Sequence, residues 1–425
     1  MIGSPWASRS HRTARHLRLH RYCPSNSGKR KRKNVHQKTL KNSLKIAGFT
    51  LATVGALVCF SIYNIPRTLR TSQDIVGAAF SPDGKTLVTG HEFIASARQS
   101  KWIAKQAVGA LLLWQAQDAT RGASENSAIK LPYLVNPKNL LDSRNGGAAN
   151  DLRYSPNGRY LMAASRGSSS LGVWDFADNR WISRKFGYIA DSQATYQPIG
   201  FSNDSTLYFY AKQRIIYPKQ HGAEKQNFEE SIDGTICPTD IVAERVVDGS
   251  NAFTTANIFK DGQYAEPFRL LSDGETFACL KHRGGPVSFS GTETLEILPL
   301  KGGPPLQSWE IKEWLQDFSC SLDGRQFATT GEHNGEIMIF RRGVAEPIVL
   351  DIPNHDSISH SAFSPDGSLF AACGWGGDVF LWDARNLTFR KTLYGFDEWN
   401  QSATFSPDSK TLATVNGKVV KFWRM

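Results

Sequence analysis

The sequence predicts an all-β protein, a seven-bladed β-propeller preceded by a basic tail and one apolar segment. Three observations predict this fold: a turn motif that recurs seven times, strands that end in an aromatic residue, and a spacing that suits four-stranded units. The clearest copy runs from Ser361 to Asp383 and reads S-A-F-S-P-D-G-S-L-F-A-A-C-G-W-G-G-D-V-F-L-W-D. It reads as a strand, a tight turn, an apolar strand, a Gly-rich turn and a strand ending in Trp-Asp.

The turn motif is clean at Phe80–Gly84 and at Phe363–Gly367, which both read F-S-P-D-G. Proline fixes φ and Asp-Gly supplies the turn that follows, so each copy predicts a strand-to-strand turn. Successive copies are 42 to 74 residues apart, and a four-stranded blade takes about 40–45 residues. The longest steps therefore contain insertions, and strands cannot be placed within Lys219–Gly262. The turn residue recurs at Asp83, Asn157, Asp204, Asp273, Asp323, Asp366 and Asp408.

Five segments have the pattern of a third blade strand. They are Leu111–Gln115, Val173–Asp175, Ile337–Arg341, Val379–Asp383 and Val420–Arg424. With these strands and turns, the chain resembles the WD-repeat β-propeller family over Asp74–Met425, most strongly in blades one, two, five, six and seven. The Gly-His start and Asp-x-Gly turn of that family are mostly absent, which puts its buried hydrogen-bond tetrad in doubt but not its blades.

Blade seven lacks a fourth strand in chain order, because the chain ends at Met425 after the third strand. The segment Ile65–Thr71 precedes the first strand of blade one and can fill this place. We expect it to pair with Val419–Trp423, since a ring closed by both ends of the chain leaves no exposed edge. The resemblance to the WD-repeat family implies the same closure.

The distribution of charged residues along the chain predicts three parts. They are a disordered basic tail at 1–45, an uncharged transmembrane signal anchor at 46–63, and the propeller at 64–425. Residues 1–73 carry 15 Lys and Arg and no acidic residue, which leaves 35 basic against 39 acidic residues in the remainder. Nucleic acid is therefore not expected as a partner of the propeller. The run Lys29–Lys33 (K-R-K-R-K) suits anionic lipid head groups.

Ile46–Tyr63 is an uncharged apolar run of 18 residues. As a helix it would measure about 27 Å, enough for a bilayer core. A cleaved signal peptide is the competing interpretation, but 45 residues precede the run and no clear A-x-A site follows it. Thirteen basic residues precede the run and two closely follow it, which predicts a cytoplasmic N-terminus and an extracytoplasmic propeller. The Arg- and Ser-rich tail also suits a transit peptide, which would place the protein in an organelle inner membrane.

No motif in the chain indicates an enzyme. Nucleophile-elbow, H-E-x-x-H, P-loop and C-x-x-C patterns are absent, so neither a cofactor nor a metal is expected. We expect a membrane-anchored scaffold for protein–protein interaction. Two alternatives remain: a propeller enzyme of the lactonase or quinoprotein type with a site in the central channel, and a basic tail that binds lipid or nucleic acid. The expected innermost strands are mainly small and apolar, which argues against the enzyme.

The expected partner is a protein or peptide, bound at one face of the ring. In an antiparallel blade the turns after the first and third strands lie at one face, here called the turn face. The turn after the second strand and the links between blades lie at the other, here called the loop face. Trp and His side chains on loops of the loop face suit an interaction site, although Trp375 and Trp399 would also suit packing between blades. The candidate residues are Trp102, His333, His355, Trp375 and Trp399.

Overall fold

The computed structural model describes most of the expected propeller. The described residues are 66–91, 111–131, 149–165, 170–185, 194–214, 239–256, 258–259, 264–282, 293–312, 315–331, 336–353, 357–395 and 402–425. The basic tail (1–45) and the apolar segment Ile46–Tyr63 lie outside this set. Within the set, no helix is both long and apolar enough to cross a membrane.

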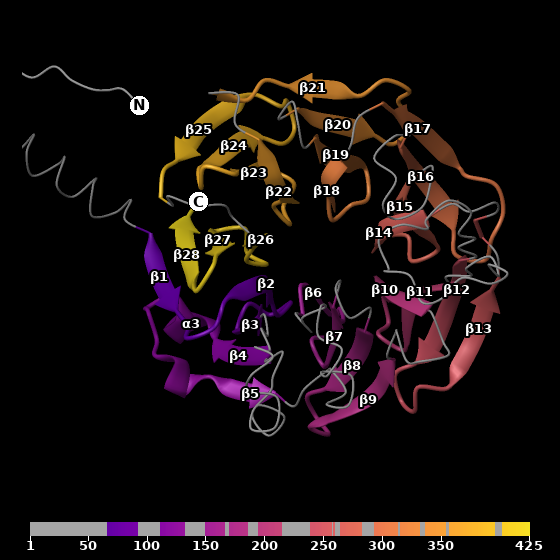
Figure 1. Ribbon diagram of the computed structural model, residues 1–425, viewed down its shortest axis with the longest axis horizontal. Helices are drawn as coiled ribbons and strands as arrows, with labels where there is room; N and C mark the ends of the chain where they lie inside the picture. The colour runs from indigo at the N-terminus through magenta and orange to yellow at the C-terminus, as the bar shows by residue number, and fades with distance from the viewer. Residues whose placement is uncertain are drawn as a thin grey trace, which may run out of the picture. The chain divides into compact units, whose positions relative to one another are not determined.

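Seven antiparallel four-stranded sheets surround a central axis, as predicted (Figure 1). Blade one contains β2 (Ile75–Phe80), β3 (Thr86–His91), β4 (Leu111–Gln115) and β5 (Ile129–Leu131), with the short helices α3 (Ala116–Ala119) and η1 (Glu125–Ser127) before β5. Blade two contains β6 (Asp151–Tyr154), β7 (Tyr160–Ser165), β8 (Ser170–Asp175) and β9 (Arg180–Lys185). Blade three contains β10 (Ala194–Phe201), β11 (Leu207–Arg214), β12 (Thr239–Arg245) and β13 (Asn251–Thr255).

The remaining blades follow the same order from the axis outward. Blade four contains β14 (Tyr264–Leu270), β15 (Thr276–His282), β16 (Glu293–Pro299) and β17 (Gln307–Ile311). Blade five contains β18 (Leu315–Cys320), β19 (Gln326–Gly331), β20 (Ile337–Arg341) and β21 (Ile348–Leu350). Blade six contains β22 (Ile358–Phe363), β23 (Leu369–Gly374), β24 (Val379–Asp383) and β25 (Phe389–Leu393). Blade seven contains β26 (Ser402–Phe405), β27 (Thr411–Asn416), β28 (Val419–Arg424) and β1 (Arg67–Arg70).

The recurring turn motif is a small hydrogen-bonded unit. In blade one the Ser81 hydroxyl donates to Asp83 Oδ1 at 2.7 Å and accepts the Thr86 N–H at 2.9 Å. Asp83 Oδ1 also accepts the Lys85 N–H at 3.0 Å. Gly84 then takes a φ of 69°, which favours glycine because it has no Cβ. The same bonds recur in the turns that begin at Ser155, Ser202, Ser321, Ser364 and Ser406.

Two turns end in serine rather than glycine, and both serines bind the neighbouring blade. Ser205 and Ser409 keep a positive φ, 59° and 58°. The Ser205 hydroxyl accepts the backbone N–H of Asn157 at 3.2 Å, and the Ser409 hydroxyl accepts that of Asp366 at 3.1 Å. Serine is less suited than glycine to a positive φ, but at these two positions its hydroxyl adds a hydrogen bond between the turns of adjacent blades.

The third strands bury their tryptophans. Trp114, Trp174 and Trp382 are each 1% exposed. In blade one, Trp114 Nε1 donates to the Thr89 hydroxyl at 2.9 Å, which in turn bonds His91 Nε2 at 2.9 Å. Burial lowers the pKa of His91 to about 4, so its imidazole is neutral at pH 7. Blade one thus contains a buried hydrogen-bonded chain of Trp114, Thr89 and His91, with His91 on the second strand.

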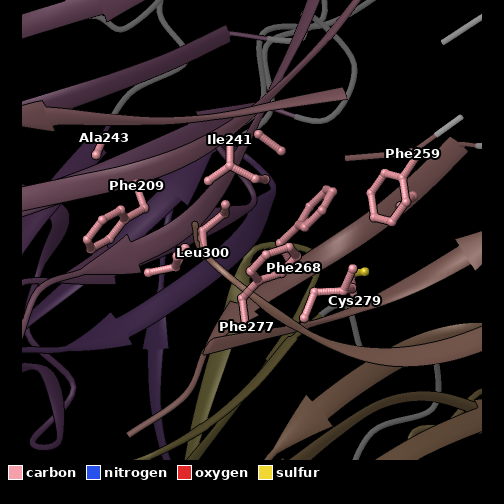
Figure 2. Packing of buried hydrophobic residues seen from close by; sticks show 12 residues of the cluster. Phe209, Ile241, Ala243, Phe259, Phe268, Phe277, Cys279 and Leu300 are labelled. Atoms are coloured by element: carbon pink, nitrogen blue, oxygen red, sulfur yellow. The ribbon is translucent and has the colours of Figure 1, made fainter. Parts of the chain in front are cut away.

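The hydrophobic core lies between neighbouring blades. Between blades three and four, where the sequence markers are weakest and the third strands contain no tryptophan, the core contains a cluster of phenylalanines (Figure 2). Phe268 of β14 lies 5.9 Å from Phe277 and 6.5 Å from Phe259, measured between ring centroids. Full burial of a side chain of this size contributes about 1.5–3 kcal/mol. Blade three places β12 and β13 within the stretch where the sequence allowed no strand assignment.

The predicted closure of the ring is confirmed. β1 pairs antiparallel with β28, with Arg67 opposite Phe422 and Leu69 opposite Val420. The Leu69 side chain is completely buried, in a cluster that includes Ile75 and Trp114 of blade one. Blade seven is therefore built from two segments far apart in sequence, and its edge is covered.

Candidate functional site: the loop face, the axial channel and the rim groove

Of the five predicted site residues, the structure describes one. Trp102, His333, His355 and Trp399 lie outside the described residues. Trp375 lies on the loop face, in the turn between β23 and β24, and 41% of its surface is exposed. Its backbone is fixed, because its N–H donates to the Ser357 carbonyl at 2.8 Å and the adjacent Gly374 N–H donates to the Asp378 carbonyl at 2.8 Å.

Trp375 differs from the tryptophans of the blade cores. Trp382, on the next strand of the same blade, is 1% exposed and contacts Phe370 and Phe380. The exposed indole of Trp375 on a fixed turn offers a rigid, amphipathic contact, the kind of side chain that concentrates binding energy in protein interfaces.

An axial channel of about 730 Å³ runs along the innermost strands. The lining is small and apolar where β2 and β26 contribute, with Ala78, Ala79 and Ala403. Elsewhere the expectation of a mainly apolar lining is wrong, because β6, β14 and β18 place charged side chains in the channel. These are Asp151, Arg153, Glu266, Arg269 and Asp317.

Arg153 connects three blades across the channel. Its Nε and Nη2 donate to the two carboxylate oxygens of Asp151 at 2.9 and 2.7 Å. Its Nη1 donates to the Ile199 carbonyl of blade three at 2.6 Å, and Nη2 to the Phe268 carbonyl of blade four at 2.8 Å. Ile199 is the residue passed over at a bulge in β10, and a bulge leaves a residue without ladder partners. The arginine thus satisfies a carbonyl that the sheet does not.

The other charged groups in the channel also bind between strands. Arg269 Nη1 donates to the Phe268 carbonyl at 2.9 Å and lies 3.4 Å from Asp151 Oδ2. Burial and the neighbouring charge of Arg153 lower the pKa of Arg269. Asp317 Oδ2 accepts the backbone N–H of Ser361 at 2.8 Å and so links blades five and six. Within the described parts of the chain, no group of three or more His, Cys, Asp and Glu side chains could hold a metal ion.

A second cavity, here called the rim groove, lies between the outer strands of blades five and six. Its volume is about 420 Å³. Val349 of β21 is 53% exposed and Phe389 of β25 is 44% exposed. Phe389 contacts Trp382 edge-to-face, with ring centroids 5.6 Å apart. The groove is lined by Arg341, Ile348, Val349, Leu350, Asp351, Trp382, Arg385, Asn386, Leu387 and Phe389.

No residue of the rim groove was predicted from the sequence as a binding residue, although Arg341 and Trp382 lie in predicted third strands. Its members come from β20, β21 and the β24–β25 hairpin, so only the docking of two blades brings them together. The available signal was weak: I-V-L at Ile348–Leu350 and the aromatic Phe389 are apolar residues on outer strands, where polar side chains are expected.

Comparison with known proteins identifies one repeat directly. The family model described as WD domain, G-beta repeat matches residues 347–383, from β21 through β24. The chain is 33% identical over 100 residues to WD repeat and SOCS box-containing protein 1 of Danio rerio, a stretch that covers 23% of each chain. It is 32% identical over 100 residues to the Homo sapiens protein of that name, covering 23% of this chain and 24% of that one.

The matched stretch thus spans about a quarter of the length of these curated relatives. The seven four-stranded sheets, the recurring turns and the matched repeat together support a WD-repeat propeller protein. The chain contains a seven-bladed β-propeller, and residues 347–383 match the WD domain, G-beta repeat model.

Proposed function

We propose that the protein is a membrane-anchored interaction scaffold whose propeller binds a protein or peptide at its loop face. The observation that carries the loop-face assignment is Trp375, 41% exposed on a turn whose backbone is fixed by hydrogen bonds. The WD40 repeat supports the scaffold role, since propellers of this kind generally bind proteins. His333, His355, Trp102 and Trp399 remain candidate contributors to the same face.

The relatives support an adaptor role. By name they combine WD repeats with a second module, the SOCS box. Such a combination suits a propeller that recognises one protein while another part of the chain engages a second one.

The membrane part of the proposal depends on the sequence alone. Ile46–Tyr63 would cross the bilayer as a signal anchor, and Lys29–Lys33 would bind anionic lipid on the cytoplasmic side. If the protein is instead imported into an organelle, Ile46–Tyr63 would anchor it in the inner membrane after import. The alternative of an enzyme with a channel site has less support, because Arg153, Asp151 and Asp317 are engaged in bonds between strands and blades.

The test replaces Trp375 by Ala and by Phe in the full chain and measures capture of partners by crosslinking in native membranes, followed by mass spectrometry. We expect Trp375→Ala to lose the captured protein, Trp375→Phe to keep part of it, and neither to change the melting temperature. Leu322→Ala is the matched control, since Leu322 is 70% exposed on the turn face. If Trp375→Ala lowers the melting temperature while the folded protein still captures its partner, Trp375 is a packing residue and the loop-face assignment is wrong.

A further inference from the structure

The rim groove presents an apolar surface that the blades do not cover. Ile348 is 40% exposed and Val349 53% exposed, whereas Leu350 of the same strand is 7% exposed and packs in the core. Phe389 is held against Trp382 and so is fixed in place. A volume of about 420 Å³ lies within the range of about 300–1,000 Å³ that is usual for ligand sites. The groove can therefore bury one or two apolar side chains of a partner.

The charge of the groove is unbalanced toward arginine. Arg341 and Arg385 line it, with Asp351 as the acidic lining residue. Arg341 Nη2 donates to the Arg385 carbonyl at 3.3 Å, while its Nε is buried and has no hydrogen-bond partner among the described residues. The exposed Arg385 guanidinium forms no ion pair within the described chain, in contrast to Arg390, which pairs with Asp383 at 2.5 Å. Two guanidinium groups beside an apolar wall favour a carboxylate, which arginine can bind through two parallel hydrogen bonds.

The strand at the wall of the groove has an open edge. β21 pairs with β20 through Ile337–Leu350, Met338–Val349 and Ile339–Ile348, and it ends its sheet. An extended peptide can add to such an edge by backbone hydrogen bonds. In an added strand, residues i and i+2 point to the same side. Ile348 and Leu350 share one side of β21, and Leu350 lies in the core between blades five and six.

We propose that the rim groove binds an extended acidic peptide in which a carboxylate side chain and an aliphatic side chain stand two residues apart. The aliphatic side chain packs between Ile348 and Phe389, and the carboxylate binds Arg341 and Arg385. This site is separate from the loop face. The turns after the third strands lie at the turn face, so the fourth strands β21 and β25 begin there, and the groove lies toward that face. It gives the scaffold a second surface, with its own partner chemistry.

The probe is a dye-labelled nonapeptide in which Glu and Leu alternate with Thr, so that Glu and Leu share one side of the strand. Its binding to the full chain is measured by fluorescence anisotropy at low and high salt. We expect saturable binding that weakens with salt, and at least about tenfold weaker binding for Arg385→Glu and for Phe389→Ala. A peptide with Lys in place of Glu is expected not to bind.

A matched control exists in blade one. Ile129 of β5 is 58% exposed and pairs with Leu113 on the third strand of blade one. Ile348 pairs in the same way with Ile339 on the third strand of blade five. We expect Ile348→Thr to weaken binding and Ile129→Thr to leave it unchanged. Equal loss in both variants, no binding to the wild-type chain, or equal binding of the Lys peptide would each overturn the proposal. The Trp375→Ala variant is expected to bind the probe normally. A negative result for the rim groove therefore does not contradict the loop-face proposal, and a negative result for the loop face does not contradict the rim-groove proposal.

Discussion

At the scale of single residues, the carboxylate of the turn motif is held ionised. Partial burial by itself would raise the pKa of Asp366, but hydrogen bonds from the Ser364 hydroxyl and the Ser368 backbone lower it to about 2. The pKa values of Asp83, Asp204, Asp273 and Asp408 are also lowered. A group with a lowered folded-state pKa stabilises the fold above its unfolded value of 3.8, and this contribution is lost as the pH falls toward 2.

We therefore predict that Asp366→Asn makes the melting temperature less sensitive to acid. Between pH 5 and pH 2 the wild-type melting temperature should fall more steeply than that of the variant, because an amide at this position does not titrate. Thermal melts followed by circular dichroism at half-unit pH steps measure the difference. The turn of blade two shows that an amide is tolerated, since Asn157 Oδ1 accepts the Ser155 hydroxyl at 2.7 Å and the Arg159 N–H at 3.0 Å.

Asn157 provides the reverse experiment. Asn157→Asp should add an acid-dependent fall of the melting temperature, because the new carboxylate would accept the same two hydrogen bonds. Parallel pH curves for the wild type and for both variants would contradict this account of the turn.

At the scale of elements, β1 completes the ring. We predict that a chain starting at Asp74 aggregates or melts at a clearly lower temperature, because β28 is left with an unpaired edge and the pocket of Leu69 is left empty. Loss of a buried leucine side chain alone costs about 2–5 kcal/mol. Size-exclusion chromatography and thermal melts of the two chains measure the effect.

The control moves β1 without removing it. Arg67 pairs with Phe422 near the end of β28, so residues 65–71 can be attached after Met425 through a short turn and still pair in register. This rearranged chain should recover the wild-type melting temperature. If the Asp74 chain is already soluble and equally stable, β1 does not close the ring.

The sequence predicted the elements that carry local signals. Turn chemistry is local, so variants of the F-S-P-D-G turn, each paired with a third strand that contains Trp or Phe near its end, located blades one, two, five, six and seven. Blades three and four were harder, because β12 (T-D-I-V-A-E-R) and β16 (E-T-L-E-I-L-P) contain no tryptophan. Their core is instead the phenylalanine cluster, assembled from strands of two blades.

Contacts between blades could not be predicted, because each sequence motif lies within a single blade. The rim groove joins Arg341 of blade five to Phe389 of blade six. Glu244 of blade three, 5% exposed, accepts hydrogen bonds from Tyr208 and Tyr210 and from Lys185 of blade two, the last at 2.8 Å. In the charged channel, Arg153 of blade two binds the Ile199 carbonyl at a bulge in β10 of blade three. Spacing along the chain carries no information on these contacts.

At the scale of the whole molecule, the separation of charge predicts the orientation in the membrane. The tail before Ile46–Tyr63 holds the excess basic charge, and for the proposed signal anchor the positive-inside rule would leave the propeller outside. We predict that a membrane-impermeant maleimide added to intact cells labels Leu322→Cys, at a position 70% exposed on the propeller, and does not label Cys23 of the tail. Mass spectrometry of the labelled peptides distinguishes the two sites.

Permeabilised cells provide the control, in which both cysteines should react. Labelling of Cys23 in intact cells without labelling at position 322 would show the opposite orientation. Labelling of neither site before permeabilisation would exclude a propeller at the cell surface, and the same labelling on isolated organelles would then test the organelle inner membrane.

The pairing of β1 with β28 also delays the completion of blade seven until the end of translation. The hydrogen bond from the Thr71 hydroxyl to the Lys418 carbonyl spans 347 residues. At about 5–20 residues per second, the ribosome needs roughly 20–70 s to supply the second partner. Throughout that interval the nascent protein carries Leu69 on a strand with nothing to pair with. A chain released before Val419 would keep Leu69 without its partner strand and would leave an open edge at β27, features that chaperones and proteases recognise. Premature termination late in the message would then be detected as readily as an early one.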